Sequence, residues 1–408
     1  MKQFSRREAP WLFDSNLQAL LQGLSMAGEE ARVVGGAVRN TLFGLPVSDV
    51  DIATTCLPQE TVDRVQALGF TAVPTGIKHG TITVVAKGHV FEVTTLRTDT
   101  LADGRHATVQ FGRDWQDDAA RRDFTVNALY ADAQGKVYDE VGGLQDIAGH
   151  TIRFIGEAED RIREDYLRIL RFYRFFAWYG EGRPDAQGLK ATAKLKAGLA
   201  RLSAERIWAE LKKLLAAPDP ARALLWMRQA GVLTAILPES EKWGIDAIPA
   251  LLAAEKVFDW PPDPLLRLQA IVPPTVKRMQ ELGRRLKLSN TEKKRLVHWA
   301  QSKPVALDSD ALSLRKRLYR EDPVAVRDRL RHGIAAENAR GGDEKAARSL
   351  DKLCRDWQSP SFPLTGKDIG ALGFQGVEIG VTLKKLEELW VESGFAMKKA
   401  ALLAKLKK

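Results

Sequence analysis

ARVVGGAVRNTLFGLPVSDVDIATT, residues 31–55, is the stretch that sets the fold of the amino-terminal part of this chain. Residues 33–34 predict a short apolar strand, because two β-branched side chains precede a glycine pair. Gly35 and Gly36 predict a turn, and residues 37–43 predict a helix after it. The stretch therefore predicts a strand, a turn and a helix, with a second strand behind them.

Asp49 and Asp51 lie two residues apart on the predicted second strand. Side chains at this spacing point to the same face of a strand, so we expect the two carboxylates to meet at one spot. Two like charges side by side usually need a cation, and oxygen ligands suit Mg²⁺, whose shell substrate phosphates and water complete. The Gly35-Gly36 pair lets backbone N–H groups come close to an anion. Together these features indicate chemistry on a nucleoside triphosphate.

Each feature also has a plainer explanation. A Gly-Gly turn is often only a turn, and an isolated Asp-x-Asp is often part of a solvated loop. Their occurrence in one strand–turn–helix–strand unit, with Arg39 on the intervening helix, favours a functional site. The lysine of a P-loop and the G-x-G-x-x-G loop are missing from this unit, which excludes the two commonest phosphate loops.

GGAVRN, residues 35–40, and DVDIATT, residues 49–55, resemble the signature of the DNA polymerase beta nucleotidyltransferase superfamily. The version found here is similar to its branch of tRNA nucleotidyltransferases and bacterial poly(A) polymerases. That family usually has Asp where this chain has Asn40. An amide keeps the hydrogen-bonding shape of a carboxylate but loses its charge, so we expect a weaker pairing with a neighbouring arginine.

RRDFTVNALYAD, residues 121–132, resembles the second motif of the same family. Arg122 offers a fixed fork of donors for ribose and phosphate oxygens. Asp123 is expected to hold that fork, and Asn127, one helical turn later, to orient it. The plainer alternative is a salt-bridged helix start.

Residues 81–86 and 89–95 predict two strands joined at Lys87-Gly88. Glu92 lies on the second of these strands, next to an apolar valine. It either supplies a third carboxylate to the metal site or is an exposed strand glutamate, and the sequence leaves both open.

RIREDYLRILRFYRFFAWYG, residues 161–180, predicts one amphipathic helix. Arg168, Arg171 and Arg174 lie opposite its apolar face, and Asp165 lies at the border one turn before Arg168. An Asp-Arg pair can match the Watson–Crick edge of a base, whereas three arginines can equally form a solvated face. The segment resembles the family's nucleobase-recognition motif, EDxxR, which favours recognition. The predicted core face comprises Tyr166, Ile169, Leu170, Tyr173, Phe176 and Ala177.

The whole chain has 408 residues and a formal net charge of +10, which suggests several domains and a polyanionic partner. Its two cysteines are no disulfide framework and fit a reducing cytosol, so we expect a cytoplasmic protein. The start, MKQFSRREAPWLF, lacks the apolar core of a signal peptide, and no run is long enough to span a bilayer, so no membrane partner is expected. Its six histidines show no zinc spacing.

Helical patterns replace strand patterns from Glu157 onward, which predicts an α+β fold. The resemblance implies an N-terminal nucleotidyltransferase head with a small mixed β-sheet at 1–150, which is catalytic and binds metal. An all-α neck at 151–232 recognises the nucleobase, and an all-α body and tail at 233–408 bind tRNA. Basic clusters within 235–360 form either an RNA-backbone track or a solvated face. These clusters are Lys277-Arg278, Arg284-Arg285-Lys287, Lys293-Lys294-Arg295 and Arg315-Lys316-Arg317.

The resemblance implies a nucleotidyltransferase that builds or repairs the 3′-terminal CCA of tRNA from CTP and ATP. The transfer needs no template, uses two metal ions and releases pyrophosphate. Asp49 and Asp51 would hold two Mg²⁺ ions, with Glu92 as a further catalytic carboxylate. The polar loop at 97–114 is expected to govern the change from C to A addition, and no obligatory protein partner is inferred. The implied nucleotide-binding residues are Gly35, Gly36, Arg39, Arg122, Asp123, Asn127, Asp165, Arg168, Arg171 and Arg174.

Three alternatives stay open. A bacterial poly(A) polymerase uses the same core, although GIKHGT, residues 76–81, resembles the tRNA nucleotidyltransferases more. An enzyme that adds only CC, or only A, would share every residue named above. A catalytically silent RNA-binding protein is disfavoured because Asp49, Asp51, Arg122 and Asp165 are all intact.

Overall fold

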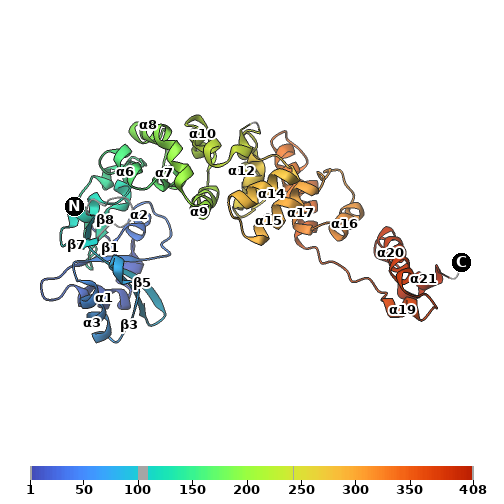
Figure 1. The fold of residues 1–408 in the computed structure, drawn as a ribbon, viewed down its shortest axis with the longest axis horizontal. Coiled ribbons are helices and arrows are strands. Elements are labelled where there is room, and N and C mark those ends of the chain that lie inside the picture. The colour runs from blue at the N-terminus through green and yellow to red at the C-terminus, as the bar shows by residue number, and fades with distance from the viewer. Residues whose placement is uncertain (1, 100–108, 242, 407–408) are drawn as a thin grey trace. The chain divides into compact units, whose positions relative to one another are not determined.

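The computed structural model describes residues 2–99, 109–241 and 243–406 (Figure 1). The chain forms two compact units, which are Met1–Leu202 with Trp226–Ala235, and Ser203–Leu225 with Ile236–Lys408. All strands in the described ranges belong to the first unit, and the second unit is helical. The predicted α+β fold, with a small mixed sheet near the amino terminus and a helical remainder, is confirmed.

The main sheet has seven strands in the order β3-β4-β5-β2-β1-β8-β9. β2 pairs in parallel with β5, whereas the other neighbouring strands of this sheet are antiparallel. A separate two-stranded sheet joins β6 and β7. The strands are β1 (Ala31–Val34), β2 (Asp51–Thr54), β3 (Thr71–Gly76), β4 (Thr81–Ala86), β5 (His89–Thr95), β6 (Arg97–Asp99), β7 (Val109–Phe111), β8 (Leu129–Ala131) and β9 (Val137–Asp139).

The predicted strand–turn–helix–strand unit forms, with one change. β1 ends at Val34, Gly35 takes a positive φ of 70°, and α2 (Gly36–Leu42) follows. β2 begins only at Asp51, so the prediction that Asp49 lies on the strand is wrong. The reason is that the β1–β2 ladder ends at the pair of Val34 and Asp51, where the chain turns away at Gly35 and leaves Asp49 without a partner residue on β1.

The predicted β4–β5 hairpin is confirmed, and helix α3 (Pro58–Ala67) precedes β3 in the chain. Lys87 and Gly88 have φ values of 46° and 92°, the left-handed conformation that two-residue hairpin turns require. Asp14 ends a 3-10 turn and caps the first N–H groups of α1 (Ser15–Leu24).

The single helix predicted at residues 161–180 is wrong, because two helices form there. α6 (Ala158–Glu164) ends where Asp165 takes an extended conformation, with φ −151° and ψ 107°. The Asp165 carboxylate accepts the N–H of Leu167, which opens α7 (Leu167–Tyr179). A side chain that caps a backbone N–H competes with helix continuation, which accounts for the break.

The buried face of α7 is wider than predicted. Ile169, Leu170, Tyr173 and Phe176 are buried as expected, whereas Tyr166 and Ala177 remain partly exposed. Two further aromatic side chains of α7 are buried, because the helix is covered on more than one side. They are Phe172 and Phe175.

The second unit is built from helices around a core that also buries charge. Arg267 is 1% exposed and pairs with Glu255, and it also donates to the carbonyls of Leu215 and Ala217 beside the end of α9.

No helix in the described ranges is long and apolar enough to cross a membrane. The remaining helices are η1 (Pro10–Phe13), η2 (Ile77–His79), α4 (Trp115–Ala120), η3 (Thr125–Asn127), α5 (Gly143–Ala148), α8 (Ala186–Leu195), η4 (Lys196–Arg201), α9 (Ala204–Leu215), α10 (Ala221–Gln229), α11 (Val232–Ile236), η5 (Pro238–Ser240), α12 (Ala247–Val257), α13 (Pro264–Ile271), α14 (Val276–Arg285), α15 (Asn290–Gln301), α16 (Ala311–Arg320), α17 (Pro323–Asn338), α18 (Glu344–Arg355), α19 (Gly366–Gly370), α20 (Val377–Glu392) and α21 (Lys399–Ala404).

Candidate nucleotide and metal site

The carboxylates of Asp51 and Glu92 lie side by side on the main sheet. Asp51 opens β2 and is in register with Glu92 on the parallel strand β5. Both side chains are exposed, whereas Ile52 and Val93, which follow them, are fully buried. Residues in register on neighbouring strands point to the same face, so the structure brings Glu92 next to Asp51.

Asp49 lies two residues before Asp51 and is exposed, with its Oδ2 2.9 Å from the hydroxyl of Ser48. Partial burial raises the pKa of Asp51, and the negative charges of Glu92 and Asp49 raise it further, while Arg122 opposes them. Two neighbouring carboxylates therefore repel that of Asp51 in the protein alone, which is the situation that a bound cation relieves.

The donor set fits a hard divalent cation in its chemistry, because Asp49, Asp51 and Glu92 offer only oxygen. In the described ranges, however, no group of three or more acidic, His or Cys side chains is gathered closely enough to hold a metal. An ion held by one or two of these carboxylates would take its other ligands from substrate phosphates and water.

The Gly35-Gly36 turn lies between two guanidinium groups. A Cβ added at Gly35 would be 3.5 Å from the carbonyl oxygen of Asn127 and 3.9 Å from Nη1 of Arg122, and one at Gly36 would be 3.9 Å from Nη2 of Arg39. Gly35 also needs its positive φ. The turn thus presents bare backbone beside two positive charges, which suits a phosphate group.

Arg122 is held by Asp118 rather than by Asp123, which corrects the sequence prediction. The Asp118 Oδ2 accepts from Nε and Nη2 of Arg122, at 3.1 and 2.9 Å, and from the hydroxyl of Tyr130 at 2.8 Å. Burial would raise the pKa of Asp118, but Arg122 and Arg121 outweigh it, so the pKa is lowered and the carboxylate stays ionised. Asp118 was not predicted from the sequence, although its i,i+4 spacing from Arg122 was a usable signal.

Asp123 instead links the second motif to helix α7. Its Oδ2 accepts from Nε of Arg171 at 2.6 Å, and its Oδ1 accepts from Nδ2 of Asn127 at 2.9 Å. Asn127 lies in the short helix η3, and its Oδ1 accepts from Nη1 of Arg39 at 2.5 Å. Arg171 is therefore engaged by the head motif rather than exposed on a solvated face.

Asp165 lies just before α7, and Arg168 and Arg174 lie on that helix. Arg168 donates to the carbonyl of Arg161 at 2.8 Å and to Oε2 of Glu164 at 2.5 Å. The guanidinium of Arg174 lies 4.3 Å from the ring centre of Phe175. Arg168, Arg171 and Arg174 are partly buried and recur every third residue, so they share one face of α7.

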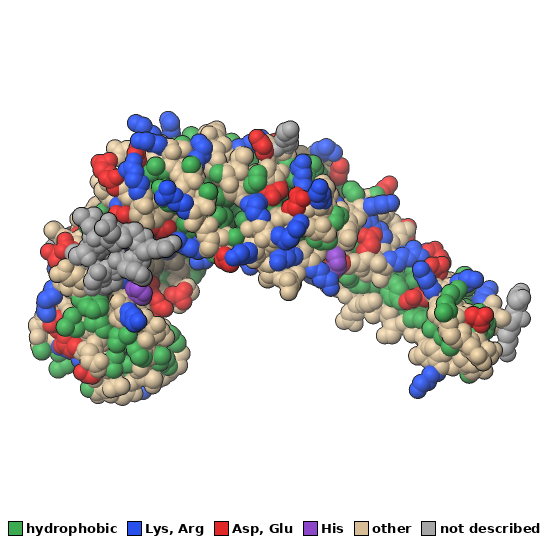
Figure 2. Space-filling view, viewed as in Figure 1, with side chains coloured by type: hydrophobic (Ala, Val, Ile, Leu, Met, Phe, Trp, Pro, Cys, Tyr) green, Lys and Arg blue, Asp and Glu red, His purple; other side chains and the backbone are tan. Residues whose placement is uncertain are grey.

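The basic clusters of the second unit divide into paired and exposed groups. Arg295 is paired with Asp263 and Asp328, and Arg317 with Glu321, so these cations stabilise the fold. Figure 2 shows Lys and Arg side chains spread over the helical part of the visible face and mixed with acidic ones.

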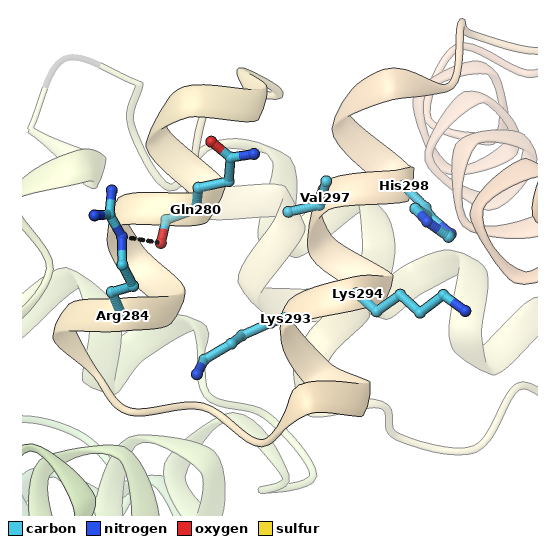
Figure 3. Close-up of a pocket in the computed structure, with 6 residues that line it drawn as sticks. All are labelled: Gln280, Arg284, Lys293, Lys294, Val297 and His298. Carbon is cyan, nitrogen blue, oxygen red and sulfur yellow. Dashed lines mark hydrogen bonds between the residues drawn. The ribbon is translucent and has the colours of Figure 1, made fainter.

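One basic groove lies between α14 and α15, with a volume of about 570 Å³ (Figure 3). α14 contributes Arg284, whose Nε bonds the carbonyl of Gln280 at 3.4 Å, and α15 contributes Lys293 and Lys294. Three cationic side chains line the groove, which suits an anionic ligand. Its lining residues are Gln280, Arg284, Lys293, Lys294, Val297 and His298.

The loop predicted to govern the change from C to A addition falls largely on residues 100–108, which lie outside the described residues. Its base is the β6–β7 hairpin. Arg113, just after β7, pairs with Glu29 and donates to the carbonyl of Gly28 at 3.0 Å, so the base is tied to the head.

Family models and known proteins both match this chain. Residues 31–153 match the family described as the poly A polymerase head domain, and residues 184–243 match a probable RNA and SrmB- binding site of polymerase A. The mitochondrial CCA tRNA nucleotidyltransferase 1 of Mus musculus is 35% identical over 405 residues, which cover 97% of this chain and 91% of that protein.

Bacterial relatives add a second comparison. The CCA-adding enzyme of Geobacillus stearothermophilus is 41% identical over 246 residues, covering 59% of this chain and 58% of that enzyme. The crystal structure of a Bacillus stearothermophilus CCA-adding enzyme in complex with CTP superposes with a TM-score of 0.75 at 28% identity, covering 93% of this chain and 92% of that one. The head match, the coverage of nearly the whole chain and the motif geometry agree, and the chain belongs to the family of CCA tRNA nucleotidyltransferases and poly(A) polymerases.

Proposed function

We propose that this protein builds or repairs the 3′-terminal CCA of tRNA from CTP and ATP and releases pyrophosphate. The observation that carries this proposal is the arrangement at the sheet edge. Asp51 and Glu92 are in register on β2 and β5, and the Gly35-Gly36 turn lies next to Arg122. Acidic oxygens beside a phosphate seat are what transfer of a nucleotide requires.

This family of nucleotidyltransferases uses a divalent metal, and we propose Mg²⁺ as the ion. Asp49, Asp51 and Glu92 are the residues that would hold it. Bound there, the metal would lower the pKa of the tRNA 3′-hydroxyl and neutralise charge on the triphosphate and the departing pyrophosphate. Gly35 and Gly36 seat the triphosphate through their backbone.

The surrounding side chains supply charge and positioning. Arg122, fixed by Asp118, contacts ribose or phosphate oxygens, and Arg39 adds charge beneath the turn. Asn127 holds Arg39, and Asp123 holds Asn127 and Arg171. We assign base choice to Asp165 and Arg168, with Arg171 and Arg174 on the same helix.

We also propose the three-part division into a head at 1–150, a neck at 151–232, and a body and tail at 233–408 that bind tRNA. The groove between α14 and α15 supports this, because Arg284, Lys293 and Lys294 can neutralise backbone phosphates. Both cysteines are free and buried, which supports a cytoplasmic location.

Incubation with tRNA transcripts and single nucleotides tests the function. Transcripts that lack all of CCA, lack only the final A, or are complete are each mixed with CTP, ATP, or both. The proposal expects CTP to extend the first, ATP to extend the second, and the third to stay unchanged. Long A tails on any transcript would instead show a poly(A) polymerase, and use of only one nucleotide would show a CC-adding or A-adding enzyme.

A further inference from the structure

Arg39 is a buried cation whose hydrogen-bond partners given by the structure are neutral. Its side chain is 9% exposed, on α2 directly after the glycine turn. It donates to Oδ1 of Asn127 at 2.5 Å, to Oδ1 of Asn40 at 2.9 Å, and to the hydroxyl of Tyr179 at 2.8 Å. Its guanidinium carbon also lies 4.4 Å from the ring centre of Tyr179. A buried cation held so closely fixes the groups around it.

Asn40 uses both ends of its amide. Its Oδ1 accepts from Arg39 and from the Tyr179 hydroxyl, at 2.9 and 3.1 Å. Its Nδ2 donates to the carbonyl of Pro46 at 2.9 Å. Pro46 belongs to the short segment that joins α2 to Asp49. A carboxylate could replace the acceptor end of this residue but could not donate to Pro46.

Tyr179 anchors the far end of α7 to the head. Its ring stacks on Phe43, the residue after α2, with centroids 5.2 Å apart and an interplanar angle of 23°. Two turns earlier on the same helix, Arg171 is bound by Asp123, which also holds Asn127. A closed circuit of contacts therefore runs from α2 through η3 to α7 and back to α2 at Tyr179.

We propose that Asn40 and Tyr179 are positioning residues that couple the segment carrying Asp49 to the base-selecting helix α7 through Arg39. The inference rests on the proposed function and names two residues that it does not use. Neither side chain touches a reacting atom. Asn40 positions the segment that carries Asp49 through its bond to Pro46, and Tyr179 orients α7. Variants of Asn40 should therefore change the Mg²⁺ dependence, and variants of Tyr179 the base choice.

Tyr179→Phe removes the hydroxyl and keeps the ring that stacks on Phe43. Loss of hydrogen bonds to one buried cation corresponds to roughly a tenfold fall in kcat/KM for CTP. Because α7 is then less firmly oriented, UTP incorporation relative to CTP should rise severalfold. Asn40→Asp strengthens the acceptor toward Arg39 with a charge but loses the donor to Pro46, so the Mg²⁺ concentration for half-maximal activity should rise severalfold with base choice unchanged.

The matched control is Tyr138→Phe, which removes a hydroxyl that donates to Asp132 in the same unit. It should keep the activity, base choice and Mg²⁺ dependence of the unchanged protein, and melting curves show whether each variant is folded. If Tyr179→Phe slows CTP and UTP in equal proportion, or Asn40→Asp keeps the original Mg²⁺ dependence, the coupling does not exist. If the unchanged protein extends no truncated tRNA, the proposed function fails instead, so the two failures are distinguishable.

Discussion

At the scale of single residues, the head places carboxylates side by side, which does not stabilise the fold. Asp51 and Glu92 are in register on neighbouring strands, and Arg122 is the cation that opposes their repulsion on Asp51. Like charges placed opposite each other destabilise a sheet. The arrangement is useful when a cation binds, and it is therefore the natural place to test the chemistry.

Replacing either Asp49 or Asp51 with Ala should lower nucleotide addition by at least about a thousandfold, since several kcal/mol of charge stabilisation are lost with the metal. Binding of tRNA should survive, because the basic groove of the second unit is unchanged. Primer extension and filter binding measure the two properties. Asp63→Ala, at an exposed position on α3, is the control and should keep full activity. Near-normal turnover of either variant at saturating Mg²⁺ would contradict the metal assignment.

Asp165→Asn should relax base choice more than it slows the reaction. The amide keeps the acceptor that caps the N–H of Leu167, so α7 can still start there. The charge and the acceptor pattern toward the base change, and a wrong base then leaves fewer buried groups unpaired, each of which costs roughly 1–3 kcal/mol. Competition of UTP and GTP against CTP and ATP measures the effect.

The control for base choice is Arg174→Ala, three residues further along the same face of α7 from Arg171, which Asp123 binds. It should change affinity for nucleotide with little change in preference. An Asp165→Asn protein that slows all nucleotides equally would show that the start of α7 is scaffolding.

At the scale of elements, the first unit depends on how α7 docks against the second motif. Asp123 is 9% exposed, and its Oδ2 lies 2.5 Å from Nη2 of Arg171. Burial would raise the pKa of Asp123, but Arg171 and the bond from Asn127 outweigh it and lower the pKa. The ion pair therefore joins two elements that are distant in sequence.

Arg171→Ala should destabilise the first unit by roughly 3 kcal/mol, because it leaves a buried carboxylate without its partner. Denaturant unfolding followed by circular dichroism measures the loss. Arg163→Ala removes pairs with Glu159 and Asp160 on the exposed side of α6, and it should cost far less stability, because exposed pairs are screened by water. Equal effects of the two variants would show that docking of α7 does not depend on the buried pair.

His332 on helix α17 makes the stability of the second unit depend on pH. Burial lowers the pKa of His332 to about 4, and Arg329 and Arg295 add to the shift. Since the unfolded chain binds a proton at a pKa near 6.5, the free energy of unfolding should fall as the pH drops from about 6.5 toward about 4, by at most roughly 3 kcal/mol. The contribution is complete above about pH 6.5.

His332→Gln provides the comparison for that pH dependence. It keeps a donor for Oε1 of Gln269, which lies 3.1 Å from Nε2 of the histidine, and it cannot titrate. Melting temperatures at about pH 4.5 and about pH 7.5 should differ less for the variant than for the unchanged protein. The same pH dependence in both proteins would assign the acid sensitivity to other groups.

At the scale of the whole molecule, the net charge of +10 favours a polyanionic partner, but only part of that charge is available. Arg295 and Arg317 neutralise carboxylates inside the second unit. Lys294 and Arg284 are exposed at the groove between α14 and α15. The groove is therefore where a polyanion would find charge that the fold does not already use.

Arg284→Ala and Lys293→Ala should each weaken tRNA binding and reduce the slope of log affinity against log salt by about one, as expected for one phosphate contact each. Arg340→Ala, whose exposed side chain pairs with Glu337, is the control and should leave the slope unchanged. Fluorescence anisotropy at several salt concentrations measures the slope. Unchanged slopes for the groove variants would place the tRNA elsewhere.

The sequence by itself determined the elements and the kind of chemistry. Alternation and turn residues located β4, β5 and the turn at Lys87-Gly88, and the glycine pair located the turn before α2. These features are local, since backbone preferences and side-chain periodicity act over a few residues. The motifs around Asp49, Arg122 and Asp165 indicated the class of enzyme for the same reason.

Only the tertiary structure decided which groups meet. The register of β2 with β5 puts Glu92 beside Asp51, and the ladder end at Val34 leaves Asp49 off the strand. Because α7 docks with Arg171 against Asp123, these two side chains pair, and Arg122 pairs with Asp118 instead. Such pairings depend on strand register and helix docking between segments far apart in the chain, and no pattern within either segment contains that information.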